Sequence, residues 1–192
     1  LVINMIKGLI SQGYRVMLFN REMSNTEMLK KMVVMESNAL KYGNIRRNDL
    51  SDNDKEEFDL ISEKMKIDYQ NLIMYDNVRT LSDCLREIAK HKPDVVIDDY
   101  VQLIRPPKIK YDARRLELEK ICNDYKWLAK ENQCVVILAS QLNRGLEHRG
   151  VRAAKPQLSD LAESGAIEQV AENVFFVHYQ WKMHPDKKKN KG

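Results

Sequence analysis

The sequence predicts an α/β fold, in which a mainly parallel β-sheet is flanked by helices. Short apolar runs alternate along the chain with segments of helical spacing, which is the order expected of parallel strands joined by helices. The apolar runs are continuous, so we expect each strand to be covered on both faces. No linker and no internal repeat is visible, which favours a single domain over residues 1–192.

Five apolar runs are predicted to be buried strands. In chain order they are residues 15–19, 72–75, 94–98, 134–138 and 174–178. Ligands of open parallel sheets bind beyond the carboxyl ends of the strands. The residues that follow these runs are therefore the first place to search for a functional site.

Helices are predicted between the runs. Ser24, followed three residues later by Glu27, has the pattern of a capping box and begins the first of them. The predicted helices cover residues 24–40, 51–66, 80–91 and 112–131. Helix-spaced apolar residues also begin at Leu1, without an initiator Met or a capping residue, so we expect this helix to be entered partway. With the polar run at residues 186–192, this pattern suggests an excerpt clipped at both ends.

The composition excludes several classes of protein. Lys and Arg number 32 and Asp and Glu 28, and the net charge of +4 is too small to indicate a nucleic-acid partner by itself. The three cysteines form neither a disulfide framework nor a zinc pattern, so a cytoplasmic, reducing setting is expected. No apolar run is long enough to suggest a membrane partner. The seven glycines leave little room for a glycine-rich phosphate loop.

Polar residues follow three of the predicted strands. Glu22 follows the first, Asp98 and Asp99 follow the third, and Gln141 follows the fourth. Two carboxylates after an apolar run are costly to bury, and a nucleotide with Mg²⁺ would supply the counter-ion. An amide at such a position can sense a phosphate or orient water. Each residue alone also fits an ordinary turn or helix cap, but together they match the layout of a P-loop ATPase.

Four segments resemble, in order, the motifs of the DnaB-type replicative helicases. They are residues 21–24, 97–103, 140–144 and 159–169. The resemblance covers residues 1–192 and implies a RecA-like P-loop ATPase core. The phage primase-helicases and the Sms/RadA-type ATPases are looser relatives.

This resemblance implies roles for the residues at the strand ends. Glu22 would be the general base that polarises the attacking water, and Asp99 would be the Walker B carboxylate that acts on Mg²⁺. Gln141 would be the sensor between the γ-phosphate of ATP and the DNA loop. Residues 159–169, which include Glu163 and Gly165, would form that loop and the helix after it.

The chain departs from the family's pattern at several places. Asp98 stands where the family usually has an apolar residue, which leaves the metal role open between Asp98 and Asp99. Ala162 stands where an Arg usually contacts a phosphate. The 192 residues contain neither the Walker A motif nor the arginine finger, which in the family lie just before Leu1 and after the last residue here. We therefore expect residues 1–192 alone to show little ATPase activity and no strong Mg·ATP binding.

Two basic clusters are predicted to contact the DNA backbone. The first contains Arg105, Lys108 and Lys110, and the second contains Arg144, Arg149 and Arg152. Both lie in long segments after strands, and such loops are often functional. Their cations would follow phosphates without reading the bases. A merely solvated surface is the alternative.

The sequence thus predicts an ATP-dependent DNA helicase motor. The intact protein would form a homo-oligomeric ring, usually a hexamer, and move on single-stranded DNA in the cytoplasm of a bacterial cell or phage-infected host. Primase and a helicase loader are further partners that the resemblance implies. Two alternatives remain at this stage: a catalytically inactive helicase-like module that binds DNA or a ring subunit, and a Sms/RadA-type recombination ATPase.

Overall fold

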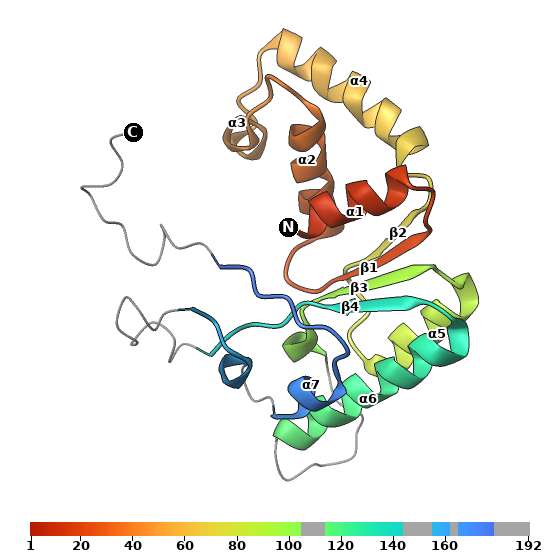
Figure 1. Cartoon of the computed structure of the whole chain (residues 1–192). Helices are drawn as coiled ribbons and strands as arrows, with labels where there is room; N and C mark the ends of the chain where they lie inside the picture. The colour runs from red at the N-terminus through yellow and green to blue at the C-terminus, as the bar shows by residue number, and fades with distance from the viewer. Residues whose placement is uncertain (105–113, 144–154, 162–164, 179–192) are drawn as a thin grey trace, which may run out of the picture.

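The computed structural model describes residues 1–104, 114–143, 155–161 and 165–178, and it shows a β-sheet between two layers of helices (Figure 1). Helices α1 to α4 lie on one face of the sheet, and α5 to α7 lie on the other. Among the described residues, no helix combines the length and the apolar composition needed to span a lipid bilayer.

Within the described residues, the sheet has four parallel strands in the order β2-β1-β3-β4. Their bounds are Val16–Asn20 for β1, Leu72–Tyr75 for β2, Val95–Asp99 for β3 and Val135–Leu138 for β4. All five residues of the central strand β1 are buried, which confirms the prediction of a strand covered on both faces. The pairing register places Asn20 of β1 beside Asp99 of β3.

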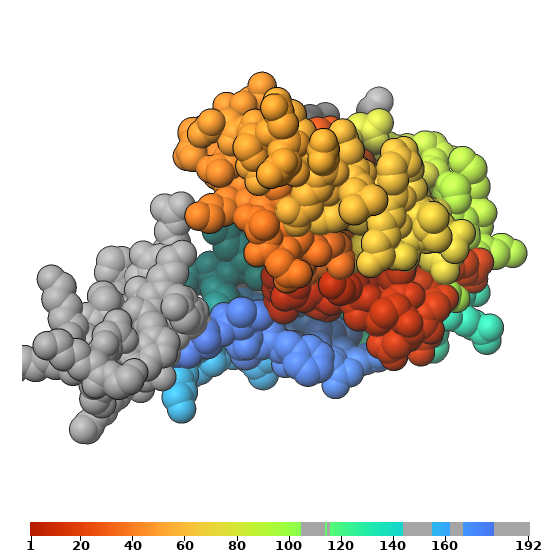
Figure 2. Space-filling model, turned by 90° about the horizontal axis from the view of Figure 1, so that it is seen from above, coloured from red at the N-terminus to blue at the C-terminus, as the bar shows by residue number. Residues whose placement is uncertain are grey.

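The first helical layer consists of α1 (Val2–Ser11), α2 (Asn25–Glu36), α3 (Tyr42–Arg47) and α4 (Asp52–Asp68). Val16 and Leu18 of β1 belong to the same apolar core as Ile6 of α1 and Met32 of α2. Figure 2 shows this layer from above, where the red, orange and yellow helices form a continuous surface. Gly13, with a φ of 87°, makes the turn that leads from α1 into β1.

The second layer consists of α5 (Leu81–His91), α6 (Arg114–Asn132) and the short α7 (Gly165–Val170). Two 3₁₀ turns, η1 (Val101–Leu103) and η3 (Leu158–Asp160), complete the described elements. Met17 and Phe19 of β1 pack with Ile88 and Tyr125 in the core of this layer. Alternate side chains of β1 therefore enter the two cores, as the strand geometry requires.

The helix starts confirm the predicted N-caps, but the capping box predicted at Ser24 is incomplete, because the Glu27 carboxylate accepts from the hydroxyl of Tyr42 at 2.6 Å. Ser24, Ser51 and Thr80 each accept a hydrogen bond from the backbone N–H three residues later. The end of α2 lies at Glu36, earlier than the predicted residue 40. Helix α3 was not predicted, because its six residues are too few for a periodic pattern and its start lacks a side-chain cap.

The prediction of a strand at residues 174–178 is wrong. This segment has no regular secondary structure and joins no strand of the described sheet. Phe175 and Val177 are 88% and 68% exposed. An apolar run becomes a strand only when a neighbouring strand satisfies its backbone N–H and C=O groups, and this run has no such neighbour in the described part of the chain.

Candidate functional site

The carboxyl ends of β1 and β3 bring Glu22 and Asp99 together. The backbone N–H of Arg21 donates to the carbonyl O of Asp99 at 2.9 Å, which holds the segment after β1 against the end of β3. Burial raises the pKa of Asp99, and the neighbouring charges of Glu22 and Asp98 raise it further. The Glu22 side chain is exposed, whereas Asp99 is half-buried. A cation beside Asp99 would relieve this unfavourable charge.

The first helix begins at the same edge of the sheet (Figure 1). Helix α1 covers the face of the sheet from which the Asp99 side chain projects. Among the residues that the structure describes, no side chain caps the amino end of α1. The free N–H groups of a helix start attract anions, and phosphate above all. The edge thus combines groups that attract a cation with groups that attract a phosphate.

Asp98 occupies a different environment from Asp99. Its fully buried carboxylate accepts hydrogen bonds from Nε of Arg21 at 2.6 Å and from Nη2 of Arg21 at 2.7 Å. The hydroxyl of Tyr125 also donates to it, at 2.5 Å. Both oxygens of Asp98 are therefore engaged on the α5–α6 side of the sheet. The geometry does not support the expectation that Asp98 shares the metal role, because these bonds hold it on the face away from Asp99.

Arg21 is buried because its guanidinium group is fully partnered. Besides Asp98, it donates to the carbonyl O of Val78 at 2.9 Å and to Sγ of Cys84 at 3.0 Å. Burial acts to lower the pKa of Arg21, but the bonds to Asp98 outweigh it and keep the pKa above its ordinary value. Burial, together with the charge of Asp98, raises the pKa of Tyr125 well above its usual range. This network ties the end of β1 to β3, to α6 and to the segment before α5.

Gln141 lies after β4, at the same edge of the sheet as Asp99, with an exposed side chain. Its backbone N–H donates to Oε1 of Gln102 at 3.4 Å, and Nε2 of Gln102 donates to Oγ of Ser140 at 2.9 Å. The backbone N–H of Val101 donates to the carbonyl O of Ala139 at 3.0 Å. Gln102 therefore links the segment that carries Gln141 to the segment that follows Asp99. No role for Gln102 was expected from the sequence.

Most of the predicted DNA contacts lie outside the described residues. These are Arg105, Lys108, Lys110, Arg144, Arg149, Arg152 and Glu163. Gly165 is described and begins α7. On one flank of the predicted DNA loop, Leu161 forms an antiparallel bridge with Leu142. On the other flank, Nζ of Lys126 donates to the carbonyl O of Val170 at 3.0 Å, so both flanks are anchored to the domain.

Sequence reasoning missed Asn20, the last residue of β1. Its side chain is 1% exposed, and within the described residues neither its Oδ1 nor its Nδ2 has a hydrogen-bond partner. Alternation along β1 places Asn20 on the same face as Leu18, and the pairing register places it beside Asp99. A polar residue that ends a fully apolar strand is the signal that would have identified it.

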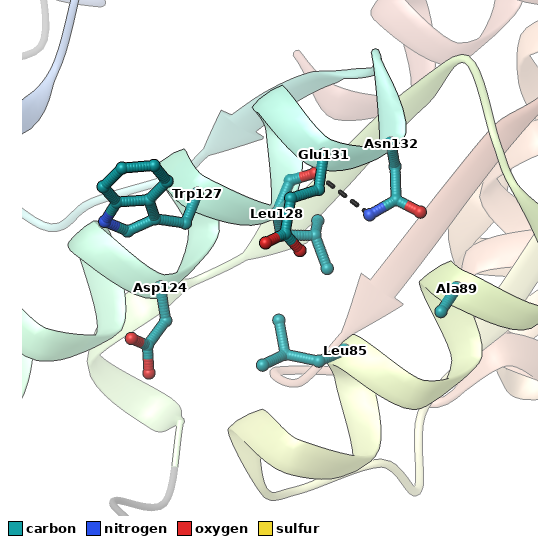
Figure 3. A pocket seen from close by; sticks show the side chains of 7 residues that line it. All are labelled: Leu85, Ala89, Asp124, Trp127, Leu128, Glu131 and Asn132. Carbon is teal, nitrogen blue, oxygen red and sulfur yellow. Dashed lines mark hydrogen bonds between the residues drawn. The ribbon is translucent and has the colours of Figure 1, made fainter.

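A separate hollow lies between α5 and α6 (Figure 3). It encloses about 400 Å³ and is lined by Leu85, Ala89, Asp124, Trp127, Leu128, Glu131 and Asn132. Leu85 and Leu128 point toward each other across it, and the carboxylate of Asp124 accepts a hydrogen bond from Lys120 at 2.9 Å. None of the residues at the strand ends lines this hollow, so it is distinct from the site.

The residues at the strand ends fit a Mg²⁺ ion that is also held by phosphate. The described part of the chain contains no group of three or more His, Cys, Asp or Glu side chains that could hold a metal by itself. Mg²⁺ usually needs only one or two carboxylates, because water and phosphate oxygens complete its shell. Asp99, with the amide of Asn20 beside it, supplies a donor set of this kind, and that amide has no hydrogen-bond partner in the part of the chain that the structure describes.

Comparison with known sequences places the chain in a family. The family model described as DnaB-like helicase C terminal domain matches residues 1–192. The replicative DNA helicase DnaB of Mycobacterium intracellulare is 35% identical over 167 residues, which are 84% of this chain and 28% of that protein. A probable plasmid replicative DNA helicase of Chlamydia psittaci is 34% identical over 178 residues, which are 88% of this chain and 37% of that protein. The chain thus spans well under two thirds of the length of these relatives.

Solved structures lead to the same family. One solved ATPase domain superposes with a TM-score of 0.84 at 27% identity, over 98% of this chain and 67% of that one. A DnaB-like replicative helicase, solved in a study of its interactions with primase, superposes with a TM-score of 0.77 at 28% identity, over 88% of this chain and 41% of that one. These similarities confirm the predicted RecA-like α/β core with its mainly parallel sheet. The chain belongs to the family of DnaB-like helicase C-terminal domains.

Proposed function

We propose that this domain is the motor of an ATP-dependent replicative DNA helicase and that it hydrolyses ATP at the edge formed by Glu22 and Asp99. The observation that carries the proposal is the convergence of these two acids at the ends of β1 and β3, beside the start of α1. Membership of the helicase family supports the reaction, and the position of the acids supports the choice of residues.

Each acid has a separate task in this proposal. Glu22 is exposed and free to approach a water molecule, so it acts as the general base that takes the proton of the attacking water. Asp99 is half-buried and holds the Mg²⁺ of the nucleotide, mostly through water. When bound, Mg²⁺ neutralises charge on the phosphate oxygens. Asp98 takes no direct part, since Arg21 and Tyr125 occupy its oxygens.

Gln141 would couple hydrolysis to DNA. Its segment is joined through Gln102 to the end of β3, so a change at the phosphate could reach the segment after β4. The basic residues of the two predicted clusters, with the loop that holds Glu163, would follow the phosphates of single-stranded DNA. A hexameric ring, with primase and a helicase loader as partners, completes the proposal for the whole protein.

The substitution Glu22→Gln in the full-length protein tests the proposal. We expect DNA-stimulated ATP hydrolysis to fall by about 100-fold or more, because general-base catalysis is typically worth this much. Binding of a fluorescent ATP analogue should stay near the normal value, since glutamine keeps the size of the side chain. Glu131→Gln, which changes an exposed acid on the distant α5–α6 hollow, is the matched control.

Two results would contradict the proposal. Normal hydrolysis by the Glu22→Gln protein would show that Glu22 is not the base. Absence of hydrolysis by the unchanged full-length protein, with DNA and Mg²⁺ present, would favour the inactive helicase-like module.

A further inference from the structure

We propose that Asn20 is a positioning residue of the same site, and that its carboxamide contacts the hydrated Mg²⁺–phosphate group held by Asp99. This inference rests on the proposed function and assigns a role to a residue outside the acid pair. It starts from an amide that the fold buries without a partner.

The burial of Asn20 has no structural benefit within the described residues. Its side chain is 1% exposed, and both of its polar atoms lack a hydrogen-bond partner there. A buried amide in this state destabilises the fold, because it has lost water and gained nothing in exchange. The other four residues of β1 are apolar and fully buried, so an apolar residue would suit this position better. Native proteins retain few such unpaired groups, and a catalytic role or a bound water or ion is the usual explanation of one that remains.

The position of Asn20 in the sheet indicates where a group bound to its amide would lie. Asn20 and Asp99 are register partners on adjacent parallel strands, so their side chains leave the same face of the sheet. Val16, Leu18 and Ile97 show that this is the face covered by α1 and α2. Helix α1 begins at the same edge of the sheet (Figure 1). The amide therefore lies beside Asp99, on the face of the sheet that α1 covers.

The chemistry of the amide suits a hydrated cation bound to phosphate. Oδ1 can accept a hydrogen bond from a water in the shell of Mg²⁺, and Nδ2 can donate to a phosphate oxygen. Mg²⁺ keeps several waters when it binds proteins, so groups that hold those waters are needed around it. A neutral amide performs this task without adding a third negative charge beside Asp99 and Glu22.

The first test measures metal affinity without hydrolysis. In the full-length protein with ADP, Mn²⁺ is titrated and free Mn²⁺ is followed by electron paramagnetic resonance. We expect Asn20→Leu to weaken Mn²⁺ binding by about tenfold or more, as loss of an outer-shell contact usually does. The same variant should unfold at an equal or higher temperature, because it removes an unpaired amide. Unchanged Mn²⁺ affinity would overturn the proposal.

Asn132→Leu is the matched control for this substitution. Its amide lies at the end of α6, near the amino edge of the sheet, where Nδ2 donates to the carbonyl O of Leu128 at 3.0 Å. Removing this satisfied amide should not change Mn²⁺ affinity. If Asn132→Leu weakened Mn²⁺ binding as much as Asn20→Leu, the effect would not be specific to the site and the proposal would fail.

A second variant keeps the inference testable if leucine disturbs folding. Asn20→Asp preserves the size of the side chain and adds an acid beside Asp99 and Glu22. We expect this variant to bind Mn²⁺ more tightly without nucleotide, and its unfolding temperature to rise when Mg²⁺ is added. An unfolding temperature that does not depend on Mg²⁺ would show that residue 20 does not face the cation.

The two proposals can fail separately. If Glu22→Gln hydrolyses ATP normally while Asn20→Leu loses Mn²⁺ affinity, the base is misassigned but the role of Asn20 stands. If Glu22→Gln is inactive while Asn20→Leu binds Mn²⁺ normally, the hydrolytic site stands and the role of Asn20 is wrong.

Discussion

The buried pair of Arg21 and Asp98 explains why the neighbouring acids Asp98 and Asp99 lie in different environments. Successive residues of a strand point to opposite faces, so Asp98 and Asp99 cannot share one environment. Asp98 meets Arg21 and Tyr125 on the α5–α6 side, whereas Asp99 lies on the face that α1 and α2 cover. Spacing along the sequence left the two residues equivalent. The alternation of the strand, combined with the partners on each face, separates them.

Replacing one member of the Arg21–Asp98 pair should lower the free energy of unfolding far more than replacing both. Asp98→Leu leaves the guanidinium of Arg21 buried without its counter-charge, and we expect a loss of about 3–5 kcal/mol in the free energy of unfolding. The double change Arg21→Met with Asp98→Leu replaces the pair by apolar side chains and should recover most of that loss. Urea denaturation followed by circular dichroism measures both.

The exposed pair of Lys66 and Glu63 serves as a control for this comparison. Lys66→Ala should change the free energy of unfolding little, because solvent screens surface charges. A double variant of Arg21 and Asp98 that is no more stable than Asp98→Leu would contradict the interpretation, since the unpaired charge would then not be the cause of the loss.

At the scale of elements, a helix cap depends on residues close together in the chain, whereas a strand depends on a distant segment that pairs with it. Caps at Ser24, Ser51 and Thr80 lie within one turn of the helices that they begin, so the sequence identifies them directly. The run at residues 174–178 has the composition of a strand but lacks a pairing partner in the described sheet. Strand formation depends on a distant segment, which composition alone does not reveal.

The cap of α4 can be tested by a single substitution. Oγ of Ser51 accepts from the backbone N–H of Asp54 at 3.2 Å, and the Asp54 carboxylate accepts from the backbone N–H of Ser51 at 3.1 Å. We expect Ser51→Ala to cost about 1 kcal/mol in the free energy of unfolding, because both bonds are weakened or lost. Urea denaturation measures the change.

Ser11 provides the comparison, because its hydroxyl donates to the carbonyl O of Gly8 near the carboxyl end of α1. Ser11→Ala should stay within about 0.5 kcal/mol of the unchanged protein. Equal losses for the two serines would show that the cap has no special effect.

At the scale of the whole molecule, the sheet divides the interior into two cores. Cys84, Cys122 and Cys134 all lie in the core between the sheet and the α5–α6 layer. Burial raises the pKa of the Cys122 thiol to about 11, and it also raises the pKa of the Cys84 thiol. The thiolate is the reactive form of cysteine. The folded domain should therefore protect these thiols in two ways, because burial excludes the reagent and the raised pKa keeps the thiols protonated.

Alkylation of the cysteines therefore reports on the integrity of this core. At pH 8, iodoacetamide should modify these three residues slowly in the folded protein and completely in urea, as mass spectrometry of the peptides will show. Asp98→Leu should speed modification of Cys84, because that thiol contacts Arg21 at 3.0 Å. Rapid modification of Cys122 in the folded, unchanged protein would contradict the packing described for this layer.

The sequence by itself determined the order of the four described strands, the helix caps at Ser24, Ser51 and Thr80, and the family. It also singled out Glu22, Asp99 and Gln141 as candidate site residues. These features depend on residues close together in the chain, or on motifs that keep their wording. Only the tertiary structure decided that Asp98 is a buried partner of Arg21, that Gln102 joins two strand ends, and that Asn20 is buried without a partner among the described residues. The physical reason is that the face and the neighbours of a strand residue depend on distant segments, such as Asp98 for Arg21 across 77 residues, and no local pattern reveals that pairing.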